Sequence, residues 1–304
     1  MTPGVLILAG QTASGKSALA LELAERFGAE IVGADSRQVY RGMPIGTAAP
    51  SDAERARVPH HLVGFVDPQD RYSAARFVAD ALRAIEEIRA RGKRALVVGG
   101  TGFYVRALTG DVTLSSIYDP VLRERLAHEA RVHPPAVLAD WLRALAPGRA
   151  LTIAPNDPYR VARALEIALA QRSPAAPRHA AVLGEAQHDG SNLRTRGIPF
   201  RKLYLTIEPD ELERRIARRV ESMLANGLLE EAERVGAGAV AADAVGYREA
   251  LAYLAGLSTD AELRAQLIRN TRRYAKRQAT WFRTEPEIVA LTGPELLERI
   301  GAYW

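Results

Sequence analysis

The sequence predicts an α/β fold: a P-loop-type, mostly parallel sheet with helices on both faces, plus a helical insertion domain. Two observations support this prediction. Short apolar runs alternate with segments whose apolar residues recur at helical spacing, as in a parallel sheet covered on both sides. The first apolar run leads into a glycine-rich turn of the pattern Gly-x-x-x-x-Gly-Lys-Ser, and a helical segment follows this turn.

The elements of the sheet domain follow from local patterns. Residues 5–9 are apolar and end at the glycine-rich turn, and residues 17–27 have apolar side chains at helical spacing before Gly28. The same reasoning predicts further strands at 30–34, 95–98 and 203–207, a helix at 74–91, and a helix that follows the last strand and extends to Leu224.

The turns after the first three strands are residues 10–17, 35–40 and 99–104. Ligands of open α/β sheets bind at the carboxyl ends of the strands. We therefore expect these three turns to face one crevice.

The middle of the chain has a different character. It shows helical periodicity without convincing strands at residues 121–132, 136–145 and 158–169. Residues 173–199 are rich in Pro, Gly and small polar residues, which is typical of a mobile connector.

These patterns divide the chain into two parts. Residues 1–110 and 197–304 are expected to form a P-loop-type catalytic core that ends in basic helices. Residues 111–196 are expected to form the helical insertion domain.

Composition excludes several classes of protein. The 304 residues include no cysteine, so disulfide frameworks, thiolate metal sites and cysteine nucleophiles are excluded. The apolar run at residues 5–9 is too short for a signal peptide or a membrane span. We therefore expect a cytoplasmic protein with no membrane partner.

Positive charge is concentrated near the C-terminus. The net charge is +5, and residues 264–283 contain seven Lys or Arg and no acidic residue. A basic block on a nearly neutral body favours a polyanionic partner. Composition alone leaves a solvated helix face as an equal alternative.

The glycine-rich turn has the residues of a phosphate-binding loop. Glycines let backbone amides converge on a phosphate, and the N-terminus of the following helix adds partial positive charge. Lys16 adds a point charge, and the Ser17 hydroxyl can ligate Mg²⁺, the expected cofactor. The expected diphosphate-binding residues of this loop are Gly10, Thr12, Ala13, Ser14, Gly15, Lys16 and Ser17.

This loop alone does not settle the reaction. A nucleotide-hydrolysing enzyme normally has an apolar strand that ends in an acid and holds Mg²⁺. The strand at 95–98 ends instead in Gly99-Gly100-Thr101-Gly102, and only the strand at 30–34 leads into an acid, Asp35. Asp35 is thus either a metal-associated carboxylate or a catalytic base.

Further short motifs follow one another along nearly the whole chain. They are Asp35-Ser36-Arg37-Gln38-Val39-Tyr40, Gly46-Thr47-Ala48, His60-His61-Leu62, Tyr72-Ser73-Ala74 with Phe77, Gly99-Gly100-Thr101-Gly102 with Tyr104, Asn156-Asp157-Pro158 with Arg160 and Arg163, Arg215-Ile216 with Arg219 and Met223-Leu224, Gly246-Tyr247-Arg248, and Thr271-Arg272 through Ala275-Lys276-Arg277-Gln278 to Thr280-Trp281. In this order they resemble the tRNA dimethylallyltransferase family, whose members use a P-loop-type fold without consuming ATP. Gln11 departs from the proline that is usual there, and Ala49 from a common lysine.

The resemblance implies a reaction. A dimethylallyl group would pass from dimethylallyl diphosphate to N6 of the adenosine 3′ of the anticodon in tRNA, with release of diphosphate. It assigns Asp35 as the base that takes the N6 proton, Thr101 as a contact to both substrates, and Arg219 as a contact to the diphosphate. Negative charge grows on this leaving group in the transition state, so preorganised cations should accelerate the reaction.

The basic segment suits RNA. On a helix, Arg269, Arg272, Arg273, Lys276 and Arg277 form one cationic stripe, and a separate stripe of Leu267, Thr271, Tyr274, Gln278 and Trp281 can pack inward. The resemblance and the cationic stripe together give the expected RNA contacts: Asp35, Ser36, Arg37, Gln38, Thr101, Arg123, Tyr159, Arg160, Val161, Ala162, Arg163, Arg248, Arg272, Lys276 and Arg277. The expected partner is the tRNA anticodon stem-loop, gripped by a monomer through both the core and the insertion.

Three alternatives remain. A nucleoside or shikimate-type kinase shares the loop, but the sequence offers no compact arginine-bearing lid. An isopentenyltransferase that acts on free AMP or ATP would not need the insertion and the basic helix. A non-catalytic RNA-binding protein would not need an intact set of Lys16, Ser17, Asp35 and Thr101.

Overall fold

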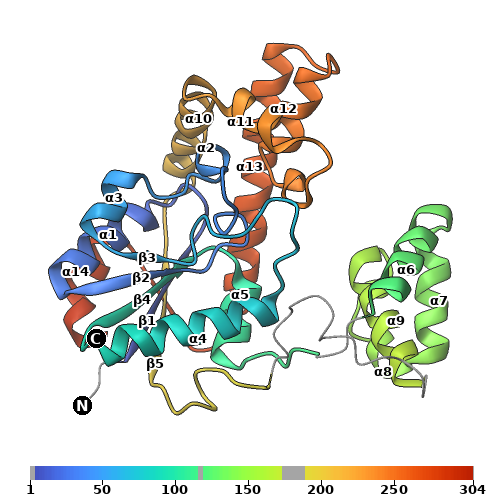
Figure 1. Cartoon of the computed structure of the whole chain (residues 1–304), viewed down its shortest axis with the longest axis horizontal. Helices are drawn as coiled ribbons and strands as arrows, with labels where there is room; N and C mark the ends of the chain where they lie inside the picture. The colour runs from blue at the N-terminus through green and yellow to red at the C-terminus, as the bar shows by residue number, and fades with distance from the viewer. Residues whose placement is uncertain (1–3, 116–118, 173–188, 304) are drawn as a thin grey trace. The chain divides into compact units, whose positions relative to one another are not determined.

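The chain forms two compact units in the computed structural model, which describes residues 4–115, 119–172 and 189–303. One unit comprises Met1–Thr113 with Gly190–Trp304, and the other is Leu114–Asp189 (Figure 1). The boundaries expected at residues 111 and 196 both fall inside the first unit, which differs from the expected division by a few residues. Residues 173–188 of the expected connector lie outside the described residues.

A six-stranded parallel sheet is the centre of the first unit, and its order is β3-β2-β4-β1-β5-β6. Its strands are β1 (Val5–Gly10), β2 (Ala29–Gly33), β3 (His60–His61), β4 (Arg94–Gly99), β5 (Phe200–Leu205) and β6 (Ile288–Leu291). The predicted parallel sheet is confirmed. The edge strands β3 and β6 were not predicted, because segments this short show no apolar alternation.

Helices cover both faces of the sheet, as predicted (Figure 1). Leu6 and Leu8, two positions apart on β1, share a buried apolar cluster with α1 (Lys16–Phe27) and α14 (Gly293–Tyr303). On the other face, α4 (Ala74–Ala90) contacts β2 and β4. This burial on both sides explains why the central strands are continuous apolar runs.

A second apolar core lies beyond the carboxyl ends of the strands. Its residues come from loops and from α2 (Pro44–Thr47), α10 (Pro209–Ala225), α11 (Leu228–Val235), the 3-10 turn η2 (Val240–Asp243), α12 (Tyr247–Leu254) and α13 (Asp260–Phe282). The other helices of this unit are α3 (Asp52–Arg57) and α5 (Gly102–Thr109). Leu263 and Leu267 of α13 are buried in this core. The inward stripe predicted for this helix therefore packs as expected at Leu267.

The second unit is a small helical body with its own core. Its helices are α6 (Pro120–Val132), α7 (Pro135–Leu145), α8 (Pro147–Ala150) and α9 (Pro158–Arg172). Leu138 and Leu142 of α7 pack with Val161 and Leu165 of α9. The helical periodicity predicted for this part of the chain is confirmed.

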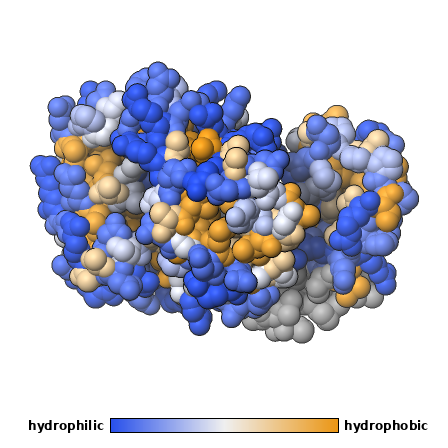
Figure 2. All heavy atoms as spheres, turned by 90° about the horizontal axis from the view of Figure 1, so that it is seen from above, coloured by the Kyte–Doolittle hydropathy of each residue, from blue (hydrophilic) through white to orange (hydrophobic). Residues whose placement is uncertain are grey.

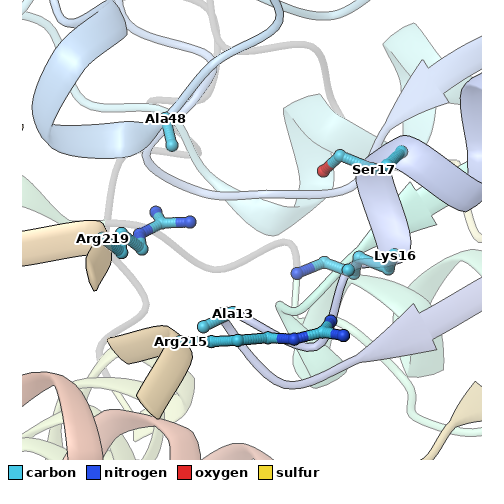
Figure 3. Close-up of a pocket in the computed structure, with 8 residues that line it drawn as sticks. Ala13, Lys16, Ser17, Ala48, Arg215 and Arg219 are labelled. Atoms are coloured by element: carbon cyan, nitrogen blue, oxygen red, sulfur yellow. The ribbon is translucent and has the colours of Figure 1, made fainter. Parts of the chain in front are cut away.

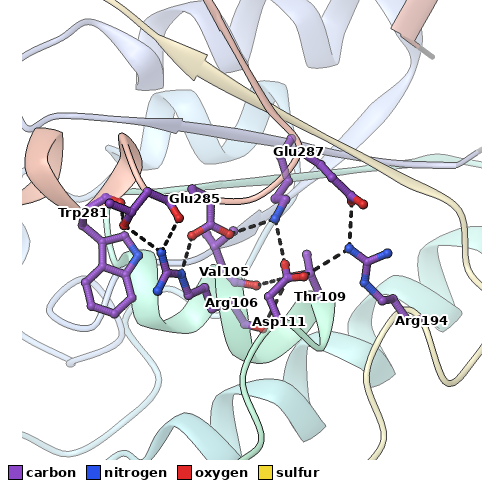
Figure 4. A network of polar contacts seen from close by, with 10 residues as sticks. Val105, Arg106, Thr109, Asp111, Arg194, Trp281, Glu285 and Glu287 are labelled. Carbon is purple, nitrogen blue, oxygen red and sulfur yellow. Dashed lines mark hydrogen bonds and ion pairs between the residues drawn. The ribbon is translucent and has the colours of Figure 1, made fainter. Parts of the chain in front are cut away.

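A buried network of ion pairs lies in the first unit, next to the points where the chain leaves this unit and returns to it (Figure 4). The Lys202 ammonium is 1% exposed and contacts Asp111 at 2.7 Å and Glu285 at 2.9 Å. Arg194 pairs with Asp111 at 3.1 Å, and Arg106 pairs with Glu285 at 2.8 Å. These ion pairs tie Asp111 and Arg194 to the core, which is the physical reason why the inserted unit is shorter than expected.

The surface is largely polar. In the view of Figure 2, hydrophilic residues cover most of the visible face and apolar residues form patches between them. Among the described residues, no helix is both long enough and apolar enough to cross a bilayer.

Candidate active site

The glycine-rich turn joins β1 to α1 in a compact loop. Gly15, the residue before α1, has a φ of 93°, and Ala13 has a φ of 63°. Both angles lie in the left-handed region, which costs glycine little and other residues more. Gly10 is also confined, because a Cβ at this position would lie 2.9 Å from Ser14 Oγ. This geometry matches the phosphate-binding loop that the spacing predicts.

A pocket of about 290 Å³ opens beside this loop. Its lining residues are Ala13, Gly15, Lys16, Ser17, Ala18, Ala48, Arg215 and Arg219. Lys16 and Arg219 point toward each other across it, from α1 and α10 (Figure 3). The pocket thus combines three cations, a hydroxyl and the start of a helix, as expected for a site that binds a phosphorylated group.

Lys16 and Arg219 are partly desolvated. Burial lowers the pKa of Lys16 to about 8, with Asp35 opposing this shift and Arg219 adding to it. Burial also lowers the pKa of Arg219 from its ordinary value, again against Asp35. Because a guanidinium stays protonated in proteins, Arg219 keeps its charge. A bound diphosphate would stabilise the charged form of both side chains.

A second pocket of about 220 Å³ shares Arg219 with the first. It is lined by residues from the turn after β2, from α2 and α10, from residues 243–246 before α12, and from α13, including Asp35, Thr47, Tyr274 and Arg277. Arg219 donates to the Thr47 carbonyl at 3.3 Å, which holds its guanidinium between the two pockets. One arginine therefore borders both the phosphate loop and the carboxylate.

The loops that carry Asp35 and Thr101 are hydrogen-bonded to each other. Asp35 Oδ1 accepts a hydrogen bond from Arg37 N–H at 2.9 Å, and the Thr101 hydroxyl accepts one from Ser36 N–H at 3.0 Å. The loops after β2 and β4 approach closely, because Gly99 has no Cβ: a Cβ there would lie 2.0 Å from the Ala34 carbonyl oxygen. The turns at 10–17 and 35–40 both line the second pocket, whereas the turn at 99–104 bonds to the second turn without being among the lining residues of either pocket.

The segment around α2 lines the second pocket and is held by a buried carboxylate. Glu231 is fully buried and accepts from the N–H groups of Ile45 and Gly46 at 3.0 and 2.8 Å, and from the Tyr247 hydroxyl at 2.6 Å. The Gln38 amide donates to the carbonyls of Thr47 and Ala48 at 3.2 and 2.9 Å. Gln38, expected to contact RNA, therefore also positions this loop.

Sequence reasoning assigned no site role to two residues that the fold places against the phosphate loop. Arg215 lies one helical turn before Arg219, lines the first pocket and donates to the Ser14 carbonyl at 3.0 Å. Its i, i+4 spacing from Arg219 was a usable signal. The other residue, Gln278, accepts from Thr12 N–H at 2.8 Å. Its position in an apolar stripe gave no sign of this contact.

Most of the expected RNA contacts of the first unit lie on exposed or pocket-lining positions, whereas Gln38 and Thr101 are partly buried and line neither pocket. Arg272 and Lys276 are exposed on α13, and Arg277 is exposed and lines the second pocket. Arg248 is exposed on α12, whereas Arg37 pairs with Asp243 at 2.6 Å. The predicted cationic stripe is therefore on the outside of the helix that packs on the core.

The expected RNA contacts of the second unit are more mixed. Arg123 and Arg163 pair with the buried Glu166, at 3.2 and 2.6 Å. Val161 is 1% exposed and packs in the core of this unit, so its side chain is covered. Tyr159 is 75% exposed and Arg160 is also exposed, while Ala162 is partly buried.

Magnesium would have to bind here mainly through its substrate. No group of three or more His, Cys, Asp or Glu residues within the described parts of the chain could hold a metal ion. Ser17 is exposed in the first pocket and offers one hard oxygen ligand. This fits Mg²⁺, which keeps several waters and commonly binds through one or two protein oxygens plus substrate phosphates.

Known proteins are similar to this chain in sequence and fold. The family model described as IPP transferase matches residues 38–285, and the model described as isopentenyl transferase matches residues 3–59. A tRNA dimethylallyltransferase from Geobacter sulfurreducens is 44% identical over 98% of this chain and 94% of its own length. The family model and this relative cover nearly the same residues as the motifs described above.

Solved structures of two transferases are also similar to this chain. A full-length tRNA isopentenylpyrophosphate transferase from Bacillus halodurans is 36% identical, with a TM-score of 0.66 over 95% of this chain and 90% of its own. A eukaryotic dimethylallyltransferase, solved acting on tRNA, is 28% identical, with a TM-score of 0.72 over 97% of this chain and 75% of its own. The chain therefore belongs to the IPP transferase family, the family of the tRNA dimethylallyltransferases.

Proposed function

We propose that this protein transfers a dimethylallyl group from dimethylallyl diphosphate to N6 of the adenosine immediately 3′ of the anticodon in tRNA. The observation that carries this proposal is the position of Arg219, which borders the cationic pocket of the phosphate loop and the pocket that contains Asp35. Two substrates bound in these pockets would meet beside one arginine. The names of the relatives support the same reaction.

In the transfer, N6 attacks the first carbon of the dimethylallyl group. A bond forms between these two atoms as the bond from carbon to the diphosphate oxygen breaks. The N6 lone pair is conjugated with the adenine ring, so the nitrogen is a weak nucleophile until its proton is removed. Asp35 takes that proton, and Thr101 holds the adjoining loop through its contact with Ser36 N–H.

Diphosphate leaves with the electron pair of the broken bond. Lys16 and Arg219 stabilise the charge that grows on it, together with the backbone amides of the loop at Gly10–Ser17. Ser17 would help to hold Mg²⁺, which would supply further charge neutralisation when bound with the diphosphate. Lys16 and Arg219 are held by the carbonyls of Gln11 and Thr47 before the donor binds, so these two side chains need little reorganisation during the reaction.

The tRNA would bind along α13 and on the second unit. Arg272, Lys276 and Arg277 lie on the exposed face of α13, and Tyr159 and Arg160 are exposed at the start of α9. Phosphate contacts of this kind give affinity without reading sequence. The target base must leave its stack to reach Asp35, which is a reason for a grip on several sides.

The test uses the protein with Mg²⁺, unmodified tRNA and labelled dimethylallyl diphosphate, without ATP. Label should appear on the adenosine 3′ of the anticodon, and Asp35→Asn should lower the rate about 10²–10⁴-fold. Asp52→Asn, an exposed carboxylate on α3, is the matched control and should keep the rate within about twofold. Phosphorylation of a small acceptor by ATP would instead support a kinase, and transfer to free AMP would support an adenylate isopentenyltransferase.

A further inference from the structure

One buried carboxamide joins the two loops that border the active site. Gln278, in the last turns of α13, is 5% exposed. Its Oε1 accepts a hydrogen bond from Thr12 N–H at 2.8 Å, and its Nε2 donates to the Gly100 carbonyl at 3.0 Å. Thr12 belongs to the phosphate loop, and Gly100 directly precedes Thr101. The same side chain therefore contacts both the phosphate loop and the loop of Thr101.

The fit around this carboxamide is specific. An amide offers one acceptor and one donor at fixed separation, and both partners are buried backbone groups that would otherwise be unsatisfied. Gly100 leaves the necessary space, because a Cβ at that position would lie 2.1 Å from Gln278 Nε2. One turn earlier on α13, the Ala275 carbonyl accepts from the Gln11 amide at 3.1 Å. Two successive turns of α13 thus hold the phosphate loop.

The opposite face of this part of α13 is cationic. Arg273 and Lys276 are exposed on that face, and the exposed Arg277, directly before Gln278, lies at its edge and lines the pocket of Asp35. A polyanion bound to these side chains would restrain the turns of α13 that also hold the two loops. The helix is rigid over such a short distance, so a restraint on one face reaches the other.

We propose that Gln278 is a positioning residue that couples tRNA binding on α13 to the alignment of the phosphate loop and the Thr101 loop. This proposal rests on the proposed transfer reaction. When tRNA is bound to α13, the carboxamide fixes Thr12 N–H relative to the loop of Thr101. The dimethylallyl donor and the adenosine acceptor are then aligned. Reacting atoms must approach within about 3–3.5 Å, and a misplacement of about 1 Å can cost about 10²-fold in rate.

The main test compares Gln278→Met with the unchanged protein and with Gln266→Met. Gln266 lies three turns earlier on α13 and is the matched control. In the unchanged protein, tRNA should tighten the binding of dimethylallyl diphosphate. In Gln278→Met this effect should disappear and kcat should fall about 10²-fold. The Kd for tRNA should stay within about threefold, because the cationic face is intact. Gln266→Met should match the unchanged protein in all three measurements.

Gln278→Glu provides a second readout that a purely structural role would not produce. A neutral carboxyl can accept from Thr12 N–H and donate to the Gly100 carbonyl, whereas a carboxylate cannot donate. Burial raises the pKa of such a group, so kcat should recover at least tenfold between pH 8 and pH 6, relative to the unchanged protein. This variant also tests the proposal if Gln278→Met fails to fold.

Two outcomes distinguish this proposal from the reaction on which it rests. If the unchanged protein transfers no dimethylallyl group to tRNA, the proposed function is wrong. If it does, but the Gln278 variants only melt at lower temperature while kcat, its pH profile and the effect of tRNA on donor binding are unchanged, Gln278 is a packing residue and the coupling is refuted.

Discussion

The Thr101 hydroxyl accepts a hydrogen bond from Ser36 N–H at 3.0 Å, although the two residues are 65 positions apart. Ser36 directly follows Asp35, so this contact fixes the backbone that carries the candidate base. Thr101 N–H donates in turn to the Ala34 carbonyl at 3.3 Å. The loops after β2 and β4 are therefore linked on both sides of Asp35.

Thr101→Val should test the hydrogen bond to Ser36 without changing the packing of the side chain. Valine has nearly the shape of threonine but cannot accept the hydrogen bond, which leaves Ser36 N–H unsatisfied at a cost of about 1–3 kcal/mol. If the unsatisfied group mainly destabilises the arrangement in which the loops of Asp35 and Thr101 are aligned for reaction, kcat should decrease about 10- to 100-fold. Steady-state assays with both substrates saturating measure this. Thr101→Ser, which keeps the hydroxyl, should remain within about threefold. Equal rates for Val and Ser would contradict a role for the hydroxyl.

Lys16 should make donor binding depend on pH. Its pKa in the ligand-free protein is lowered to about 8 by burial, and only the ammonium form attracts diphosphate. Binding raises this pKa again, so affinity is highest below pH 8 and falls as the pH rises above it. The Kd for dimethylallyl diphosphate, measured by calorimetry from pH 7 to 9.5, should increase across this range.

Lys16→Arg is the control for this pH dependence. A guanidinium stays protonated throughout the range, so the variant should bind with a nearly constant Kd, even if that Kd is weaker. A pH dependence as steep as that of the unchanged protein would assign the titration to another group.

Arg219→Lys should reduce catalysis although it keeps a positive charge. A guanidinium contacts phosphate oxygens through two parallel hydrogen bonds, which an ammonium cannot reproduce. We expect kcat/KM for the donor to fall about 10²-fold, the cost typical of losing one preorganised donor. Arg218→Lys changes the exposed neighbour on the same helix and should have no effect beyond about twofold. A similar loss in both variants would indicate a general effect of α10.

Lys202→Met should destabilise the first unit strongly. It removes the cation between Asp111 and Glu285, which are 10% and 0% exposed, and leaves their charges buried. Breaking a buried pair in this way costs about 3–5 kcal/mol in free energy of unfolding. Arg194→Met removes an arginine that is 43% exposed from the same network and should cost less than about 1 kcal/mol. Urea denaturation of both variants checks this, and equal losses would contradict it.

Acid should weaken the same network. Burial would raise the pKa of Asp111, but hydrogen bonds from Lys202 and Thr109 outweigh it and hold the pKa below the ordinary value. The stability from this carboxylate is therefore present above the ordinary pKa of aspartate, about 3.9, and is lost as pH falls through the lower value of the folded state. Asp111→Asn should remove this part of the acid dependence in urea denaturation between pH 5 and 2.5.

Local patterns in the sequence were sufficient for the parallel sheet, for the phosphate loop at Gly10–Ser17 and for the position of Asp35 after β2. Each of these features depends on residues close together in the chain, where the spacing of glycines and apolar side chains determines the backbone conformation. The family also followed from short motifs in a fixed order. The cationic stripe on α13 was predictable for the same reason, since a helix places residues three and four apart on one face.

Only the tertiary structure placed Arg219 between two pockets, set Arg215 against Ser14 and brought Gln278 to Thr12 and Gly100. Thr12 and Gln278 are 266 residues apart, and their contact depends on how α13 packs across the ends of the strands. The same holds for the ion pairs of Lys202 with Asp111 and Glu285, which set the limits of the inserted unit. A single sequence determines which groups a side chain can offer, whereas the partner it meets is decided by the packing of distant elements.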